Sequence, residues 1–150
     1  MPNLLSSVLL AGLGAAVLAQ PQQPNLAAQR DAMKKLEFLI GKWQGGASIT
    51  RGPGEPLQIT QTENVQFKLD GLVLLIEGEG RGGDGKRVYG ALATVAYDDA
   101  TSTYRFRAYN DGRYLDTELK VEADGFSWGY TAGTSESYER HAPERDRRLD

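Results

Sequence analysis

The chain contains no cysteine and only one histidine, and these two shortages exclude several kinds of chemistry. Without cysteine there is no disulfide framework and no thiolate nucleophile. The single histidine, His141, stands among charged residues near the C-terminus, so neither a Ser-His-Asp triad nor a histidine-rich metal site is expected. The sequence therefore predicts no metal site and no cofactor.

A surplus of basic residues is also missing. The 17 Lys and Arg residues are outnumbered by 20 Asp and Glu residues, which gives a formal net charge of -3. A nucleic-acid-binding domain needs a clustered basic surface, so no nucleic-acid partner is expected. A length of 150 residues, 40% of them hydrophobic, fits one globular domain with one modest core.

The N-terminus reads as an export signal. Residues 8–19 form an uncharged apolar run, and Val17 and Ala19 supply small residues at the cleavage spacing. We expect a signal peptide at residues 1–19, although it lacks a basic n-region, followed by a Pro/Gln linker at residues 20–24. The mature protein is then periplasmic or secreted and free of the membrane. An uncleaved anchor and a buried helix are the alternatives.

Turn residues at short intervals indicate an all-β domain over residues 25–131. A helix is expected from Asn25 to Ile40, with Gly41 ending it and Leu26, Met33 and Leu36 on its apolar stripe. Seven strands are then predicted in an antiparallel up-and-down meander, at residues 43–50, 57–69, 72–79, 87–97, 104–109, 114–121 and 126–131.

The Asp-Gly pair at residues 111–112 fixes the register of one hairpin. A two-residue loop there places Arg107 opposite Asp116 and Arg105 opposite Glu118. These charged pairs share one face of the sheet, while the alternate residues on the other face are mostly apolar. The two arginines are therefore expected to form surface ion pairs.

The hairpin at residues 70–71 points to a candidate ligand site. Its register places Glu63 opposite Gly78 and Gln61 opposite Gly80, on the inner face. Two glycines would leave space where a carboxylate and an amide point inward, as at the mouth of a cavity. Alternatively, the glycines permit a bend or bulge that closes a barrel.

The hairpin at residues 124–125 adds two aromatic residues to the inner face. Its expected register sets Val121 opposite Trp128 and Leu119 opposite Tyr130. Trp128 and Tyr130 are then either part of the core or a platform for the ligand.

The segment LEFLIGKWQG at residues 36–45 resembles the start of calycin barrels, in which a short helix ends in Gly-x-Trp and leads into the first strand. Within that group the chain most resembles the bacterial family called domain of unknown function 1579. The resemblance implies a closed antiparallel barrel whose apolar interior holds a small ligand. It also implies structural roles for Gly41 and for Trp43, which would plug one end of the core.

Two features of related barrels are not expected here. Nitrobindin-like proteins bind haem through a histidine near the C-terminus, but His141 is not in a strand pattern. Fatty-acid-binding proteins hold a carboxylate with an inward Arg-x-Tyr. The matching Arg107-Ala108-Tyr109 is predicted to turn its arginine to the charged face, opposite Asp116.

The predicted barrel is incomplete. Residues 132–150 are highly charged and are expected to be a disordered tail. Such barrels close with about eight to ten strands, and the sequence predicts seven. Either the chain is truncated or reads out of register near Gly133, or the barrel stays open. Open edges at residues 43–50 and 126–131 would invite a homodimer.

These features favour an exported lipocalin-like protein that binds a small apolar molecule. One alternative is an enzyme in which an inward Glu63 acts as general acid or base. A second is an interaction or structural barrel without a ligand. Val73 and Leu75 are expected on the outer face and need cover, either from the helix at residues 25–40 or from a partner.

Overall fold

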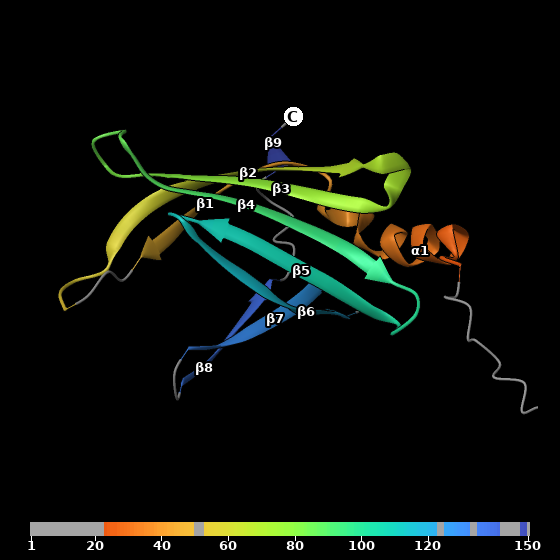
Figure 1. Cartoon of the computed structure of the whole chain (residues 1–150). Coiled ribbons are helices and arrows are strands. Elements are labelled where there is room, and N and C mark those ends of the chain that lie inside the picture. Colours follow the sequence, from red (N-terminus) through yellow and green to blue (C-terminus); the bar gives the residue numbers. More distant parts are fainter. Residues whose placement is uncertain (1–22, 50–52, 123–124, 133–134, 142–147, 150) are drawn as a thin grey trace, which may run out of the picture.

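The computed structural model describes residues 23–49, 53–122, 125–132, 135–141 and 148–149, with side chains described as far as Gly129. Most of them belong to one antiparallel sheet that curls into a half-barrel, preceded by a short helix (Figure 1). This confirms the predicted fold class, an incomplete up-and-down calycin-like barrel behind an N-terminal helix. The predicted signal peptide at residues 1–19 lies outside the described residues, as do residues 20–22 of the linker.

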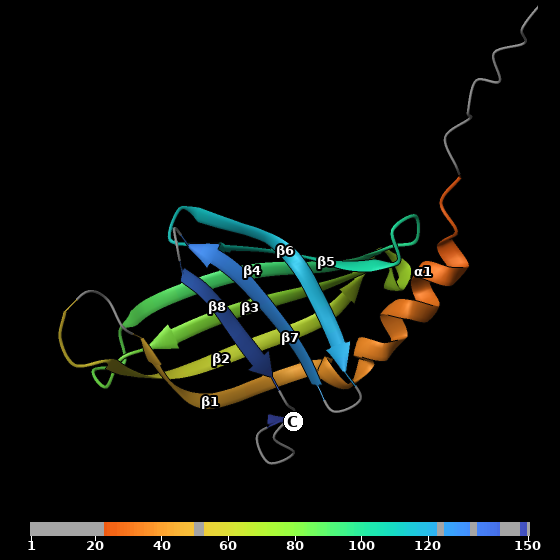
Figure 2. The same cartoon turned by 90° about the horizontal axis from the view of Figure 1, so that it is seen from below.

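Neighbouring strands in the sheet are consecutive in the sequence, except that β9 pairs with β1. Seen from below, β7 and β8 pass across β2, β3 and β4 because the sheet curls (Figure 2). The strands are β1 (Gly41–Ile49), β2 (Leu57–Lys68), β3 (Val73–Arg81), β4 (Arg87–Asp98), β5 (Thr103–Asn110), β6 (Arg113–Glu122), β7 (Gly125–Ala132), β8 (Ser135–His141) and β9 (Arg148–Leu149).

The predicted helix divides into two parts. The α-helix α1 covers Leu26–Met33, and a 3-10 helix, η1, continues over Lys34–Leu39. Asn25 caps α1, since its side chain accepts a hydrogen bond of 3.0 Å from the backbone N–H of Ala28. A 3-10 segment is common where an α-helix ends.

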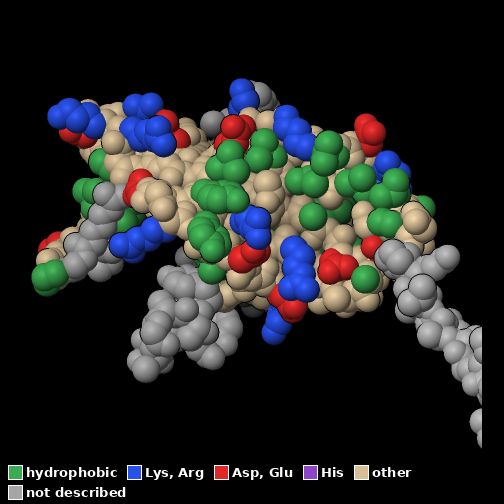
Figure 3. All heavy atoms as spheres, in the orientation of Figure 1, with side chains coloured by type: hydrophobic (Ala, Val, Ile, Leu, Met, Phe, Trp, Pro, Cys, Tyr) green, Lys and Arg blue, Asp and Glu red, His purple; other side chains and the backbone are tan. Residues whose placement is uncertain are grey.

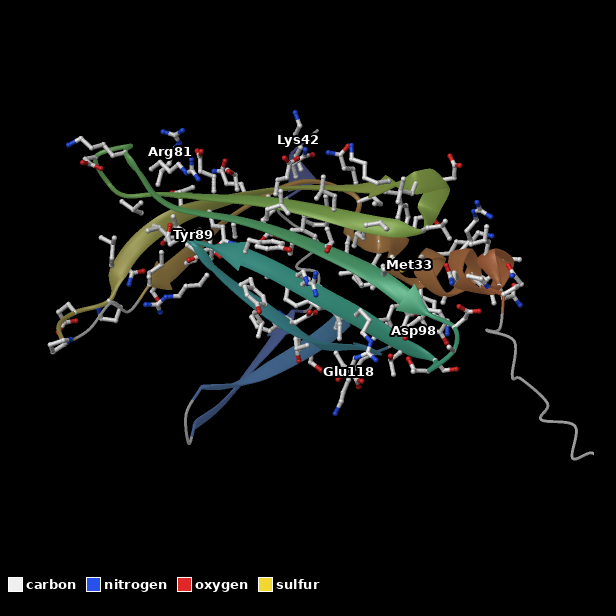
Figure 4. The ribbon with its side chains drawn as sticks, in the orientation of Figure 1. Met33, Lys42, Arg81, Tyr89, Asp98 and Glu118 are labelled. Atoms are coloured by element: carbon white, nitrogen blue, oxygen red, sulfur yellow. The ribbon has the colours of Figure 1, made fainter. Side chains whose placement is uncertain are left out.

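The core fills the end of the half-barrel next to α1. Met33 and Leu36 are fully buried, whereas Leu26, predicted on the same stripe, is 46% exposed. The two buried side chains pack with inner-face residues of six strands, namely Val65, Leu74, Ala93, Val95, Phe106, Leu119 and Phe126. Figure 4 labels Met33 where α1 meets the sheet and Tyr89 at the far end of β4. The helix therefore closes one end of the half-barrel.

Four hydrogen bonds fasten α1 to the sheet. Asp99, after β4, accepts from the backbone N–H of Asn25 at 2.7 Å and from Nε2 of Gln29 at 2.6 Å. The Tyr104 hydroxyl donates to the carbonyl of Ala32 at 2.8 Å. Arg30 Nε donates to the carbonyl of Asp70 at 2.9 Å, in the β2–β3 turn.

The Asp99 contacts make a contribution to stability that depends on pH. The hydrogen bond from Gln29, followed by that from Asn25, lowers the pKa of Asp99 below its ordinary value of 3.8. A pKa that is lower in the folded state stabilises the fold above the unfolded value, and this stability is lost as the pH falls through the folded value. In Asp99→Asn, the free energy of unfolding should therefore decrease less between neutral and acid pH than in the unmodified protein.

Urea unfolding at about pH 6 and about pH 3 checks this expectation. Part of the acid dependence should remain in the variant, because hydrogen bonds from Thr101 also lower the pKa of Asp98. An identical acid dependence in Asp99→Asn and the unmodified protein would contradict the assigned role of Asp99.

The hairpin at residues 111–112 has the predicted register. Arg107 pairs with Asp116 and Arg105 with Glu118 across β5 and β6. Arg107 Nε donates to Asp116 Oδ2 at 3.1 Å, and both side chains of this ion pair are about half exposed. Arg107 therefore lies on the outer face and does not point into the half-barrel.

The β2–β3 hairpin also keeps its predicted register, with Glu63 opposite Gly78 and Gln61 opposite Gly80. Only its tip differs. Leu69 does not continue β2, because it adopts a positive φ of 49° in a short 3-10 turn and is 70% exposed.

The predicted register of β6 and β7 is wrong by two residues. Leu119, not Val121, lies opposite Trp128, and Val121 lies opposite Phe126. Gly125, which was predicted in the loop, already begins β7 and lies opposite Glu122. Since side chains alternate with a period of two, a shift of two residues leaves Trp128 on the inner face.

The sheet also continues past Thr131, where the sequence analysis ended it. Residues 135–141 form β8, which pairs with β7, and residues 148–149 pair with β1. The predicted disordered tail at 132–150 is therefore wrong for these segments, and the expected open edge at 126–131 is covered. The strand was missed because Ser-Glu-Ser-Tyr-Glu-Arg-His has no apolar alternation, whereas pairing with an edge needs only an extended backbone.

The helix does not cover the outer face. Val73 and Leu75 lie there half-buried, but Met33 and Leu36 of the helical segment pack on the inner face. The expectation that the helix covers these two residues is therefore wrong. On the face seen in Figure 3, apolar and charged side chains stand next to one another. A hollow of about 750 Å³ on this part of the sheet is lined by Val73 together with Thr94, Ala96, Arg105, Arg107, Asp116, Thr117 and Glu118.

Candidate functional site

Four of the predicted site residues come together on β2 and β3. The register sets Glu63 beside Gly78 and Gln61 beside Gly80, away from the core around α1. Gln61 Nε2 donates a hydrogen bond of 2.7 Å to Glu63 Oε1. This bond orients the carboxylate and leaves its other oxygen able to accept from a further donor.

The two glycines differ in the space beside them. A Cβ built on Gly78 would be 3.9 Å from Glu63 Cγ, an ordinary contact distance. A Cβ on Gly80 would be only 2.6 Å from Ile59 Cδ1 and 3.1 Å from Tyr89 Cβ. Ile59 and Tyr89 thus occupy the space at Gly80 that the sequence analysis expected to be empty.

The bend expected as the alternative is also present at Gly80. The register of β3 and β4 shifts between Gly80 and Arg81, which marks an irregularity of the bulge type. Gly80 therefore serves close packing and the bend. Of the two glycines, Gly78 is the one at which a Cβ would have only ordinary contact distances.

A hollow of about 510 Å³ lies on the outer face of the sheet, behind Glu63 and Gly78. Most of its lining residues alternate with the inner-face residues along their strands, namely Lys42, Thr62, Asn64, Glu77, Glu79 and Leu92. On the inner face itself, Trp43 is opposite Glu63 and Ala91 is opposite Gly78. An apolar side chain and a hydrogen-bonding group are therefore neighbours there.

Trp128 and Tyr130 are on a different part of the sheet. In the strand order, β3, β4, β5 and β6 separate β7 from β2. Trp128 packs against the core with its ring centroid 5.0 Å from that of Phe106. The side chain of Tyr130 lies outside the described residues. A ligand role for these two aromatic residues stays a prediction.

Gly41 and Trp43 join the helical segment to the sheet. Gly41 has a φ of 137°, in the region that favours glycine, and is the first residue of β1. Trp43 Nε1 donates to the carbonyl of Leu39 at 2.7 Å, and the partly buried ring packs against the core. These positions suit the structural roles expected from the Gly-x-Trp motif.

A row of exposed apolar side chains on the outer face is not predicted from the sequence. Leu92, Tyr109 and Tyr114 are neighbours across β4, β5 and β6 and are 39%, 44% and 72% exposed. The two tyrosine rings are 6.4 Å apart between centroids. The hairpin at 111–112 already set these tyrosines opposite each other, so their pairing could have been predicted, although their exposure could not.

The described part of the chain holds neither a cluster of metal ligands nor a helix suited to a membrane. No group of three or more His, Asp and Glu residues there is arranged to hold a metal ion. No helix in the same ranges has the length and apolar character to cross a bilayer.

Comparison with known proteins adds no relative. No family model matches the chain, and neither the curated proteins nor the solved structures contain a significant match.

Proposed function

We propose that this protein is an exported, lipocalin-like binding protein that holds a small apolar molecule at the inner face of its half-barrel. The observation that carries the proposal is the Gln61–Glu63 pair beside Gly78, where a Cβ would meet nothing closer than 3.9 Å. Small-molecule sites typically combine apolar walls with a few placed polar groups. Trp43 and Ala91, the inner-face neighbours of Glu63 and Gly78, supply apolar contacts, and Glu63 supplies an acceptor for a hydroxyl or amine of the ligand.

Two expectations from the sequence support the same proposal. The apolar run at residues 8–19 favours export to the periplasm or the exterior. The Gly-x-Trp start resembles the domain of unknown function 1579 family and other calycin barrels, and membership of that family stays a prediction. The curled sheet is compatible with a binding barrel of this kind.

Nile red, a neutral apolar dye, tests the site by fluorescence titration. Gly78→Val places a branched side chain beside Glu63 and should weaken dye binding at least about tenfold, equivalent to about 1.4 kcal/mol. Gly83→Val is the matched control, because it adds the same side chain at a loop glycine where a Cβ would meet nothing within 4 Å. The control should bind the dye like the unmodified protein.

Native mass spectrometry of the protein purified from its periplasmic fraction provides a second measurement. A discrete small adduct that Gly78→Val loses and Gly83→Val keeps would identify the natural ligand. Equal dye affinity in both variants, with no adduct on the unmodified protein, would reject binding at this site.

A further inference from the structure

Within the described residues, one edge of β1 has no strand partner along most of its length. On one side β1 pairs with β2 without interruption from Gly41 to Ile49. On the other side β9 pairs only with Lys42 and Trp43. Among the described residues, no strand pairs with the remaining six residues, 44–49, on that side. Their outward backbone N–H and C=O groups form a template for a further strand.

This edge lacks the usual features that prevent strand addition. Residues 44–49 read Gln-Gly-Gly-Ala-Ser-Ile and include no charged residue and no proline. The regular register with β2 also excludes a bulge in this stretch. Natural edge strands are commonly protected by lysine, proline, bulges or a covering element. An edge of this length without charge, proline or bulge therefore indicates a pairing surface.

We propose that this edge pairs antiparallel with the same edge of a second copy of the chain, across a two-fold axis. The segment is suited to pair with itself. Gly45, Ala47 and Ile49 lie on the inner face, and Gln44, Gly46 and Ser48 lie on the outer face. If the two-fold axis is normal to the sheet, the two copies form one continuous sheet. The inner faces of both copies are then on the same side of it, and the outer faces are on the other side. No pair of like charges is created.

The proposed symmetry places the axis near Gly46. Pairing that keeps both inner faces on one side brings Gly46 opposite Gly46 or Ser48 of the second copy. Gln61 and Glu63 are on the next strand, opposite Gly45 and Trp43. The second copy would thus extend the sheet beside the candidate ligand site, although the pairing itself does not depend on any ligand.

Charged substitutions at Gly46 test the axis. A Cβ there meets nothing within 4 Å, and the backbone has no positive φ, so Gly46→Lys and Gly46→Glu should fold. Sedimentation velocity from about 1 µM to about 200 µM should show a concentration-dependent dimer of the unmodified protein. Each variant alone should dimerise at least about tenfold more weakly, because like charges would stand about 5–8 Å apart across the axis.

Mixing the two variants should restore the dimer, because lysine then faces glutamate. Gly83→Lys, which places the same charge in an open loop position, should dimerise normally. A monomer at every concentration of the unmodified protein would overturn the proposal. A dimer that survives Gly46→Lys, or variants that fail to recover on mixing, would place any interface elsewhere. Ser48→Lys, exposed on the same face, repeats the test if Gly46→Lys does not fold.

Discussion

Replacing Leu36 by alanine should lower the free energy of unfolding by about 2–5 kcal/mol. Leu36 is fully buried in η1, where it packs with Met33 and with inner-face residues of the sheet such as Val65 and Leu74. The truncation removes apolar contacts and leaves a cavity between the helical segment and the sheet. A loss of this size would establish that the segment is an integral part of the core.

Leu26→Ala is the matched control for this experiment. Leu26 was predicted on the same apolar stripe, but it is 46% exposed at the start of α1. Its truncation should change stability by less than about 0.5 kcal/mol. Urea unfolding of both variants, followed by circular dichroism, measures the difference. Equal losses would mean that α1 packs against the sheet along its whole length.

The second large effect is expected at Gly80. Gly80→Ala should destabilise the protein by about 1–3 kcal/mol, since the new methyl group would be 2.6 Å from Ile59 Cδ1 and 3.1 Å from Tyr89 Cβ. Gly78→Ala, one inner-face position away, should be neutral or slightly stabilising. Its Cβ has ordinary contact distances, and alanine reduces the freedom of the unfolded chain.

A double variant identifies the cause of the loss at Gly80. Ile59→Val removes the Cδ1 atom that a side chain at Gly80 would meet. The pair of substitutions should therefore cost less than the sum of the single ones, a coupling that a double-mutant cycle measures. Strict additivity would show that backbone strain near the β3–β4 irregularity, not contact with Ile59, causes the loss.

The hairpins show how far local sequence determines this fold. At residues 111–112 both turn residues adopt positive φ, 45° for Asp111 and 78° for Gly112, as a two-residue hairpin loop requires. The sequence therefore predicts both the turn and the register of β5 and β6. At residues 124–125 the same dipeptide misleads, because Gly125 is already paired with Glu122.

The register of β6 with β7 and the strands β8 and β9 are poorly indicated by the sequence. An Asp-Gly pair locates a turn to within about two residues. A register shift of two residues leaves every side chain on its predicted face, so the pattern of apolar residues does not reveal it. β8 has no apolar alternation to reveal it, and β9 has only two residues. Their places are determined by the backbone edges they meet, β7 for one and β1 for the other.

The candidate site was predictable in position but not in volume. The hairpin register alone brings Gln61 and Glu63 opposite the two glycines. Which glycine leaves space depends on residues distant in the chain. Ile59 and Tyr89 reach the position of Gly80, while Gly78 has only the stem of Glu63 and Ala91 close by. Packing of this kind does not follow from composition or periodicity.

The strict succession of strands has a consequence for assembly during synthesis. From β1 to β8, each strand pairs with the strand that precedes it in the sequence. The contacts between these strands are therefore local in sequence, and each hairpin can form soon after its second strand has been synthesised. β1 is different, because its second neighbour among the described strands, β9, is also the last of them along the chain. Of the described strand pairs, this one therefore forms after all the others have been synthesised.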